Sequence, residues 1–364
     1  MIPVSKPYLP NRDELNKYID GIYERRLLTN NGPLAQELTA RLEKYLGVEN
    51  LLLVSNGTLA LQVAYRALGI TNSSPNGQGE AITTPFTFVA TASSLKWDGV
   101  EPVFADIDSE TWCLDPERIE AVVTSRTRAI VPVHVFGNAC EVEEIGSVAA
   151  KHNLKVIYDA SHAFGVTYKG ESLLRYGDAA TLSFHATKLF HTIEGGAIVF
   201  KRKEDLERAK KMINFGLAGP EVVDEIGINA KMNEFQAAMG LCVLDEMDTN
   251  LASRSRVWHK YKKSFKDKLQ LQKTNSDISY NFAYFPVVFG SEKEALKVAG
   301  VLGQSDVIAR RYFFPPLDNV KLFNSLSRNE FSQDISKRIL CLPLYSDLED
   351  ESIELIIKKV NEAL

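Results

Sequence analysis

Two ionisable side chains in apolar surroundings form a pair that could do chemistry. Asp159 ends the apolar run LKVIYD, and Lys188 lies further along, in the stretch TLSFHATKLF before a double glycine. Lysine is rarely buried, so this lysine is either a surface turn residue or an amine held inward. A desolvated amine has a pKa below its ordinary value of about 10.4, and this makes it a nucleophile for Schiff-base chemistry. Asp159 is either a helix cap or a catalytic acid.

The segment from Ser55 to Thr58 supplies a third chemical group. Its sequence, SNGT, stands between the apolar run LLLV and the helix-like run LALQVAY. Gly57 lets a ligand approach the backbone, and free N–H groups at the start of a helix attract an anion such as phosphate. Taken alone, the segment is equally consistent with a plain helix cap formed by Ser55 or Thr58.

An amine, an acid and an anion cradle together match the requirements of pyridoxal phosphate. The acid keeps the pyridine nitrogen protonated, and a charged pair about 4 Å apart is worth on the order of 4 kcal/mol at an effective dielectric near 20. We therefore expect Asp159 and Lys188 to contact opposite sides of one ring. A metal is not expected, because Asp159 and His162 alone do not complete a ligand set.

The elements that must position these groups alternate between strand and helix over the first two-thirds of the chain. This alternation predicts an α/β fold with a mostly parallel central sheet and helices on both faces. Ligands of such sheets bind at the carboxyl ends of the strands, where the three groups fall. Strands are predicted at 50–54, 81–84, 103–107, 129–136 and 154–158. Helices are predicted at 58–68 and 141–152, and a further helix follows the strand at 81–84 and ends at residue 97.

After Gly240 the pattern changes to a smaller α+β unit, with a boundary near residue 245. The predicted division is a large cofactor-binding domain at 1–245, in which residues 1–30 form an arm or a substrate loop, and a small C-terminal domain at 246–364. The small unit is expected to contain helices at 241–269, 292–302 and 346–364 and strands at 280–289, 308–314 and 338–342.

Composition limits the class of protein. The chain has 364 residues, 45% of them apolar, and a net charge of −5 without strong basic clustering. A nucleic-acid partner is therefore not expected. No apolar run approaches the roughly 18 residues of a membrane span, and the start MIPVSKPYLP lacks a signal-peptide core. The expected location is the cytoplasm.

Over nearly its whole length, the sequence resembles sugar-nucleotide aminotransferases of the DegT/DnrJ/StrS type, within the fold-type I pyridoxal phosphate enzymes. The strongest signal is SFHATK followed by EGGA. The other matching segments are IPVSKPYLP, LTNNGPLAQELTARLEKYLG, SNGTLAL, TTPFTFVATASS, PVHVFGN, YDASHAFG, GINAKMNEFQAA and RRYFFPPL.

The resemblance implies roles for the residues around the cofactor ring. Lys188 would form the internal aldimine and later move a proton between the cofactor and the substrate carbon. Asp159 would pair with the ring nitrogen, and His162 would bond the 3-hydroxyl. Phe88 would stack on the ring, with an ordinary core position as the alternative.

The resemblance also implies a phosphate site shared between two subunits. Gly57, Thr58 and Ser183 match phosphate ligands from one chain, and Asn229 matches a ligand delivered by the neighbouring chain. A homodimer with shared active sites is therefore expected.

The implied reaction is transamination of a 4-keto-6-deoxy nucleotide sugar, carried on dTDP, with glutamate as the amino donor. His185 favours amination at C4, because relatives acting at C3 more often have Tyr after SF. The product would serve surface polysaccharide (O-antigen) or glycoside biosynthesis. The alternatives are a 3-aminotransferase, a pyridoxal phosphate lyase or dehydratase, and a catalytically silent homologue, against which Lys188 argues.

Overall fold

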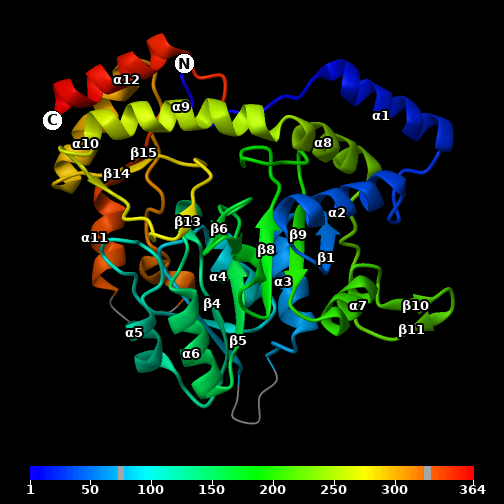
Figure 1. Ribbon diagram of the computed structural model, residues 1–364. Helices are drawn as coiled ribbons and strands as arrows, with labels where there is room; N and C mark the ends of the chain where they lie inside the picture. Colours follow the sequence, from blue (N-terminus) through cyan, green and yellow to red (C-terminus); the bar gives the residue numbers. More distant parts are fainter. Residues whose placement is uncertain (73–77, 324–328) are drawn as a thin grey trace.

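A computed structural model describes residues 1–72, 78–323 and 329–364. Its centre is a seven-stranded sheet in the order β1-β9-β8-β5-β4-β2-β3 (Figure 1). Strand β9 runs antiparallel to both of its neighbours, and the other adjacent strands are parallel. The α/β fold with a mostly parallel sheet is therefore confirmed. The strands are β1 (Leu51–Val54), β2 (Glu80–Thr83), β3 (Glu101–Phe104), β4 (Thr127–Val131), β5 (Lys155–Asp159), β8 (Ala179–Ser183) and β9 (Gly196–Phe200).

Helices cover both faces of this sheet because its strands alternate their side chains between two apolar cores. In β1, Leu51 and Leu53 join one core, whereas Leu52 and Val54 join the other. Helices α3 and α7 pack in the second core, and α2, α6 and α8 in the first. The helices up to this point are α1 (Arg12–Arg25), α2 (Pro33–Leu46), α3 (Gly57–Ala67), α4 (Val89–Trp97), α5 (Pro116–Ile119), α6 (Val142–His152), α7 (Lys203–Met212) and α8 (Glu234–Asp245).

The C-terminal part has an apolar core of its own, to which the long helix α9 near the top of Figure 1 contributes. A three-stranded sheet in the order β12-β14-β15 lies in this part. The division at residue 245 stays a prediction. The elements are α9 (Met247–Phe265), β12 (Gln270–Leu271), β14 (Pro286–Val288), α10 (Glu292–Gln304), α11 (Glu330–Arg338), β15 (Ile339–Cys341) and α12 (Asp350–Ala363). Short strand pairings elsewhere involve β6 (Thr167–Tyr168), β7 (Glu171–Ser172), β10 (Leu217–Gly219), β11 (Val222–Val223) and β13 (Ile278–Ser279).

Two predicted elements of this part are wrong. The helix expected at 241–269 is broken at Glu246, whose carboxylate accepts hydrogen bonds from the Tyr8 hydroxyl and the Asn11 backbone N–H. The strand expected at 308–314 is absent from the described chain; within it only Arg310 makes an isolated bridge, to Cys341. At Glu246, contacts with residues distant in sequence override the local helical pattern.

The N-terminal segment lies against the C-terminal part. Ile2 pairs with Val307 in an isolated parallel bridge, and the Val4 carbonyl accepts a hydrogen bond from the Leu344 N–H at 3.2 Å. The Tyr8 carbonyl lies 2.7 Å from the Nε2 atom of His191, in the loop that also carries Lys188. Residues 1–11 therefore join the small core to this loop, while their role as a substrate arm stays a prediction.

Within the described ranges, no helix has the length and apolar character needed to cross a bilayer. The same part of the chain contains no group of three or more His, Cys, Asp or Glu side chains arranged to hold a metal ion.

Candidate active site

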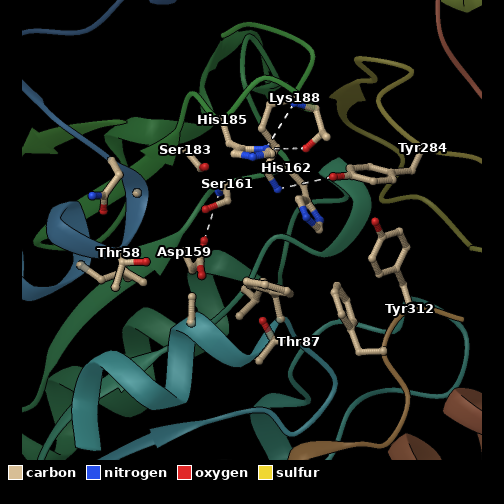
Figure 2. Close-up of a pocket in the computed structure, with 18 of the residues that line it drawn as sticks. Thr58, Thr87, Asp159, Ser161, His162, Ser183, His185, Lys188, Tyr284 and Tyr312 are labelled. Carbon is tan, nitrogen blue, oxygen red and sulfur yellow. Dashed lines mark hydrogen bonds between the residues drawn. The ribbon is translucent and has the colours of Figure 1, made fainter. Parts of the chain in front are cut away.

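A cavity of about 340 Å³ opens where the carboxyl ends of β5 and β8 meet the start of α3 (Figure 2). Seven of the eight residues predicted for the site line it: Gly57, Thr58, Phe88, Asp159, His162, Ser183 and Lys188. The eighth, Asn229, lies outside this cavity and is exposed.

Lys188 lies in the loop that follows β8, with its amine turned into the cavity. Its backbone N–H donates to the His185 carbonyl at 2.8 Å, and its Nζ atom donates to the Tyr284 hydroxyl at 3.4 Å. Burial lowers the pKa of Lys188 to about 8, an effect that the nearby Asp159 carboxylate partly offsets. The amine therefore loses its proton closer to neutral pH than an exposed lysine does.

Asp159 is held by hydrogen bonds to both carboxylate oxygens at the end of β5. Its side chain is buried, with 5% of the residue exposed. Oδ2 accepts from the Thr91 hydroxyl at 2.8 Å, and Oδ1 accepts from the Ser161 N–H at 3.1 Å. A local turn explains the bond to Ser161, but the bond to Thr91 reaches to α4. The carboxylate is therefore fixed at the cavity wall by more than a local turn.

His162 is held in a single neutral form by its surroundings. The Phe136 N–H donates to Nδ1 at 3.1 Å, which leaves the proton on Nε2. Burial, and secondarily the charge of Lys188, holds the pKa of His162 well below its ordinary value. Its ring lies 4.5 Å from the Tyr284 ring, centre to centre. A neutral N–H donor of this kind suits an anionic oxygen such as the one on the cofactor ring.

The start of α3 fits a phosphate group. Asn56 caps the helix by accepting from the Leu59 N–H at 2.9 Å, so neither Ser55 nor Thr58 is the cap. The first N–H groups of any helix have no partner inside the helix and attract anions. A Cβ atom at Gly57 would lie 2.8 Å from the Cβ atom of Ser183, so this contact between helix and strand requires glycine.

Phe88 stands immediately before α4 and is 52% exposed, so it is not the core residue of the alternative interpretation. It lines the cavity and offers an aromatic face to a planar ring.

Residues outside the predicted set of eight complete the cavity, and several of them come from the N-terminal and C-terminal parts. Arg310 places its guanidinium carbon 4.6 Å from the centre of the Tyr312 ring, and that ring lies 6.1 Å from Tyr284 in a perpendicular arrangement. The motif RRYFFPPL contains Arg310 and Tyr312 and indicated a substrate-facing region, whereas no motif of the sequence indicated Tyr284. These additional lining residues include Ser5, Thr87, Ser161, Tyr284, Arg310, Tyr312 and Phe313.

Comparisons with known proteins agree with this chemistry. The model of the DegT/DnrJ/EryC1/StrS aminotransferase family matches residues 11–361. The dTDP-4-amino-4,6-dideoxy-D-glucose transaminase of Shigella dysenteriae is 41% identical, over 99% of this chain and 98% of its own. The Escherichia coli protein of the same name is 36% identical, over 98% and 97%. The crystal structure of DesI in the presence of its TDP-sugar product superposes with a TM-score of 0.92 at 31% identity, covering 99% of this chain and 92% of DesI.

Proposed function

Because the chain belongs to the DegT/DnrJ/EryC1/StrS aminotransferase family, whose enzymes depend on pyridoxal phosphate, we propose that it aminates C4 of a 4-keto-6-deoxy nucleotide sugar. The expected product is dTDP-4-amino-4,6-dideoxyglucose, and glutamate is the expected donor. The observation that carries the proposal is the Lys188 amine, whose pKa is lowered by burial, in one cavity with the fixed Asp159 carboxylate. The names of the relatives from Shigella dysenteriae and Escherichia coli support the choice of sugar.

Different residues of the cavity would hold different parts of the cofactor. When bound, pyridoxal phosphate supplies an electron sink for the carbon that loses or gains a proton. The start of α3 with Ser183 would hold its phosphate, and Phe88 would hold its ring from one face. The Asp159 carboxylate would retain a proton on the ring nitrogen, and the Nε2–H group of His162 would bond the ring oxygen.

Lys188 would move the proton in both halves of the reaction. Its amine, with a pKa of about 8, can accept a proton from the carbon of the donor and return one to C4 of the sugar at neutral pH. The Tyr284 hydroxyl, 3.4 Å from Nζ, fixes the direction of the amine.

The alternatives remain distinguishable by reaction. A lyase or dehydratase on the same scaffold needs no amino donor, and a 3-aminotransferase needs a 3-keto sugar. The silent homologue is disfavoured, because Lys188 is present and its amine reaches the cavity.

The proposal is tested with a panel of 4-keto and 3-keto sugars on dTDP, UDP and GDP, each incubated with glutamate and the holoenzyme. Mass spectrometry should detect an amino sugar from dTDP-4-keto-6-deoxyglucose, with 2-oxoglutarate formed in equal amount. Amination of a 3-keto sugar alone would replace the C4 assignment. Loss of water from the sugar without use of glutamate would identify a dehydratase.

The second part of the proposal is a homodimer in which Asn229 completes the partner's phosphate site. Asn229 is exposed and bridges to Asn214, away from the cavity of its own chain. Its neighbours Phe215, Ile226 and Ile228 are 53%, 80% and 44% exposed. Exposed apolar side chains that gather in this way mark an interaction surface. A C2 pair would bury them and form two equivalent sites.

A mixed dimer should reveal the shared site. When the Lys188→Ala and Asn229→Ala proteins are unfolded and refolded together, about half of the dimers are hybrids, and each hybrid has one intact site. Activity should therefore rise to about a quarter of the native value, measured against each variant refolded alone. A mixture no more active than the average of the two parents would contradict the shared site, as would a monomer in sedimentation.

A further inference from the structure

Two polar residues lie on the buried face of helix α9, among apolar side chains. Asn250 is fully buried and Arg254 is 2% exposed, in line with Met247, Val257 and Tyr261. Taking an arginine out of water costs several kcal/mol unless its charge is compensated. Among the described residues, no carboxylate forms an ion pair with Arg254. Because burying these two polar residues costs folding free energy, we expect them to have a role that two apolar residues could not perform.

These two side chains tie together three segments of the chain. Asn250 donates from Nδ2 to the Leu189 carbonyl at 2.9 Å, and its Oδ1 atom accepts from Nε of Arg254 at 3.2 Å. Arg254 also donates from Nη1 to the carbonyls of Ala283 and Leu344, at 3.4 and 3.3 Å. The planar guanidinium makes these bonds in several directions at once, which an ammonium group cannot do in the same way.

Two of the three carbonyls that accept these bonds belong to residues next in sequence to Lys188 and Tyr284. Leu189 follows Lys188, and Ala283 precedes Tyr284, whose hydroxyl accepts from the Lys188 amine. Arg254 also lines a small cavity together with Thr187 and Tyr284, two residues that line the main cavity as well. The guanidinium therefore lies close to the Tyr284 segment and to the loop that carries Lys188.

We propose that Arg254 and Asn250 are positioning residues that hold the Lys188 loop against Tyr284 and thereby fix the direction and the burial of the amine. The catalytic use of Lys188 rests on the function proposed above. Without the bonds to Leu189 and Ala283, the loop and the Tyr284 segment would separate, and water would reach the amine.

The first experiment measures how the cofactor-free protein captures pyridoxal phosphate as a function of pH, from the absorbance of the lysine-bound cofactor. Lys188→Ala supplies the background from other lysines. In Arg254→Met and Asn250→Ala, the pKa of the capture profile should rise from about 8 toward the ordinary lysine value, because the amine becomes hydrated. Arg254→Lys keeps the positive charge but not the planar set of donors of arginine. The pKa of its capture profile should lie between those of Arg254→Met and the native protein.

The second experiment uses the holoenzyme with the sugar that the panel identifies. Both variants should lower kcat about 100-fold with little change in the KM of the sugar, because a displaced amine slows proton transfer without removing a substrate contact. Arg256→Met is the matched control. Arg256 lies on the same helix but donates to the Leu348 carbonyl and pairs with Asp350, so neither quantity should change.

An unchanged capture profile in folded Asn250→Ala would overturn the proposal. If Arg254→Met does not fold, the Asn250→Ala profile alone tests the proposal. A loss of kcat that only follows the fraction of unfolded protein, judged by thermal melting, would reduce the pair to a structural role. If Lys188→Ala captures the cofactor as well as the native protein, the proposed function fails instead.

Discussion

Lys188→Ala is expected to lower kcat at least about 10⁴-fold, because in the proposed function this one side chain both binds the cofactor covalently and moves the proton. The yellow colour of the lysine-bound cofactor should disappear as well. Turnover with the nucleotide sugar and glutamate, together with the absorbance spectrum, checks the result. Steady-state transamination at more than a small percentage of the native rate would remove Lys188 from its role.

The same variant should leave the fold intact and change how stability depends on pH. In the cofactor-free native protein, the pKa of Lys188 is about 8, below its value in the unfolded chain. The unfolded chain thus binds more protons between about pH 8 and pH 10.5, and the stability contribution of this group rises over that range. At lower pH, protonating the buried amine costs stability in full. Relative to Lys188→Ala, the native protein should therefore become more stable as the pH rises through this window, measured by urea unfolding.

Asp159→Asn should lower kcat about 10³-fold. The neutral amide does not hold the proton on the ring nitrogen, and the lost charged pair is worth about 4 kcal/mol at an effective dielectric near 20. Each 1.4 kcal/mol, approximately, is a factor of ten in rate. The rate at which the yellow absorbance decreases in a single turnover with glutamate measures the first half of the reaction directly.

Asp106→Asn provides a matched control for Asp159→Asn. Asp106 is also a buried carboxylate, but it accepts hydrogen bonds from the Phe331 and Ser332 N–H groups at the start of α11, away from the cavity. This variant should lose stability without losing kcat. A near-native kcat in cofactor-loaded Asp159→Asn would show that Asp159 only caps its turn.

The part of the site that lies at strand ends was accessible from the sequence. Thr58, Asp159 and Ser183 each follow or end an apolar run, and parallel strands bring their carboxyl ends to one edge of the sheet. Lys188 could be placed beside them because its apolar setting is unusual for a lysine. The α/β class follows from the same alternation of apolar runs.

The part of the site built by distant contacts was not accessible. Tyr284 reaches Lys188 from a segment predicted as a strand, although only β14 of that segment forms one. Local propensity describes neighbours along the chain, whereas the break at Glu246 depends on Tyr8, which lies far away in the sequence. Such contacts follow from tertiary packing and leave no periodic signal.

The tie between the two ends of the chain also limits when the protein can become functional during its synthesis. Ser5 lines the cavity, and its neighbour Val4 is anchored by the N–H of Leu344. A ribosome adds about 5 to 20 residues per second, so Leu344 is synthesised about 20 to 70 s after Val4. All seven strands of the large sheet precede Leu344 in the chain, but the nascent chain has no complete cavity before this residue emerges. The cofactor is therefore captured in its final form only after release of nearly the whole chain, and a polypeptide interrupted before this point would carry an unanchored N-terminus beside an open site.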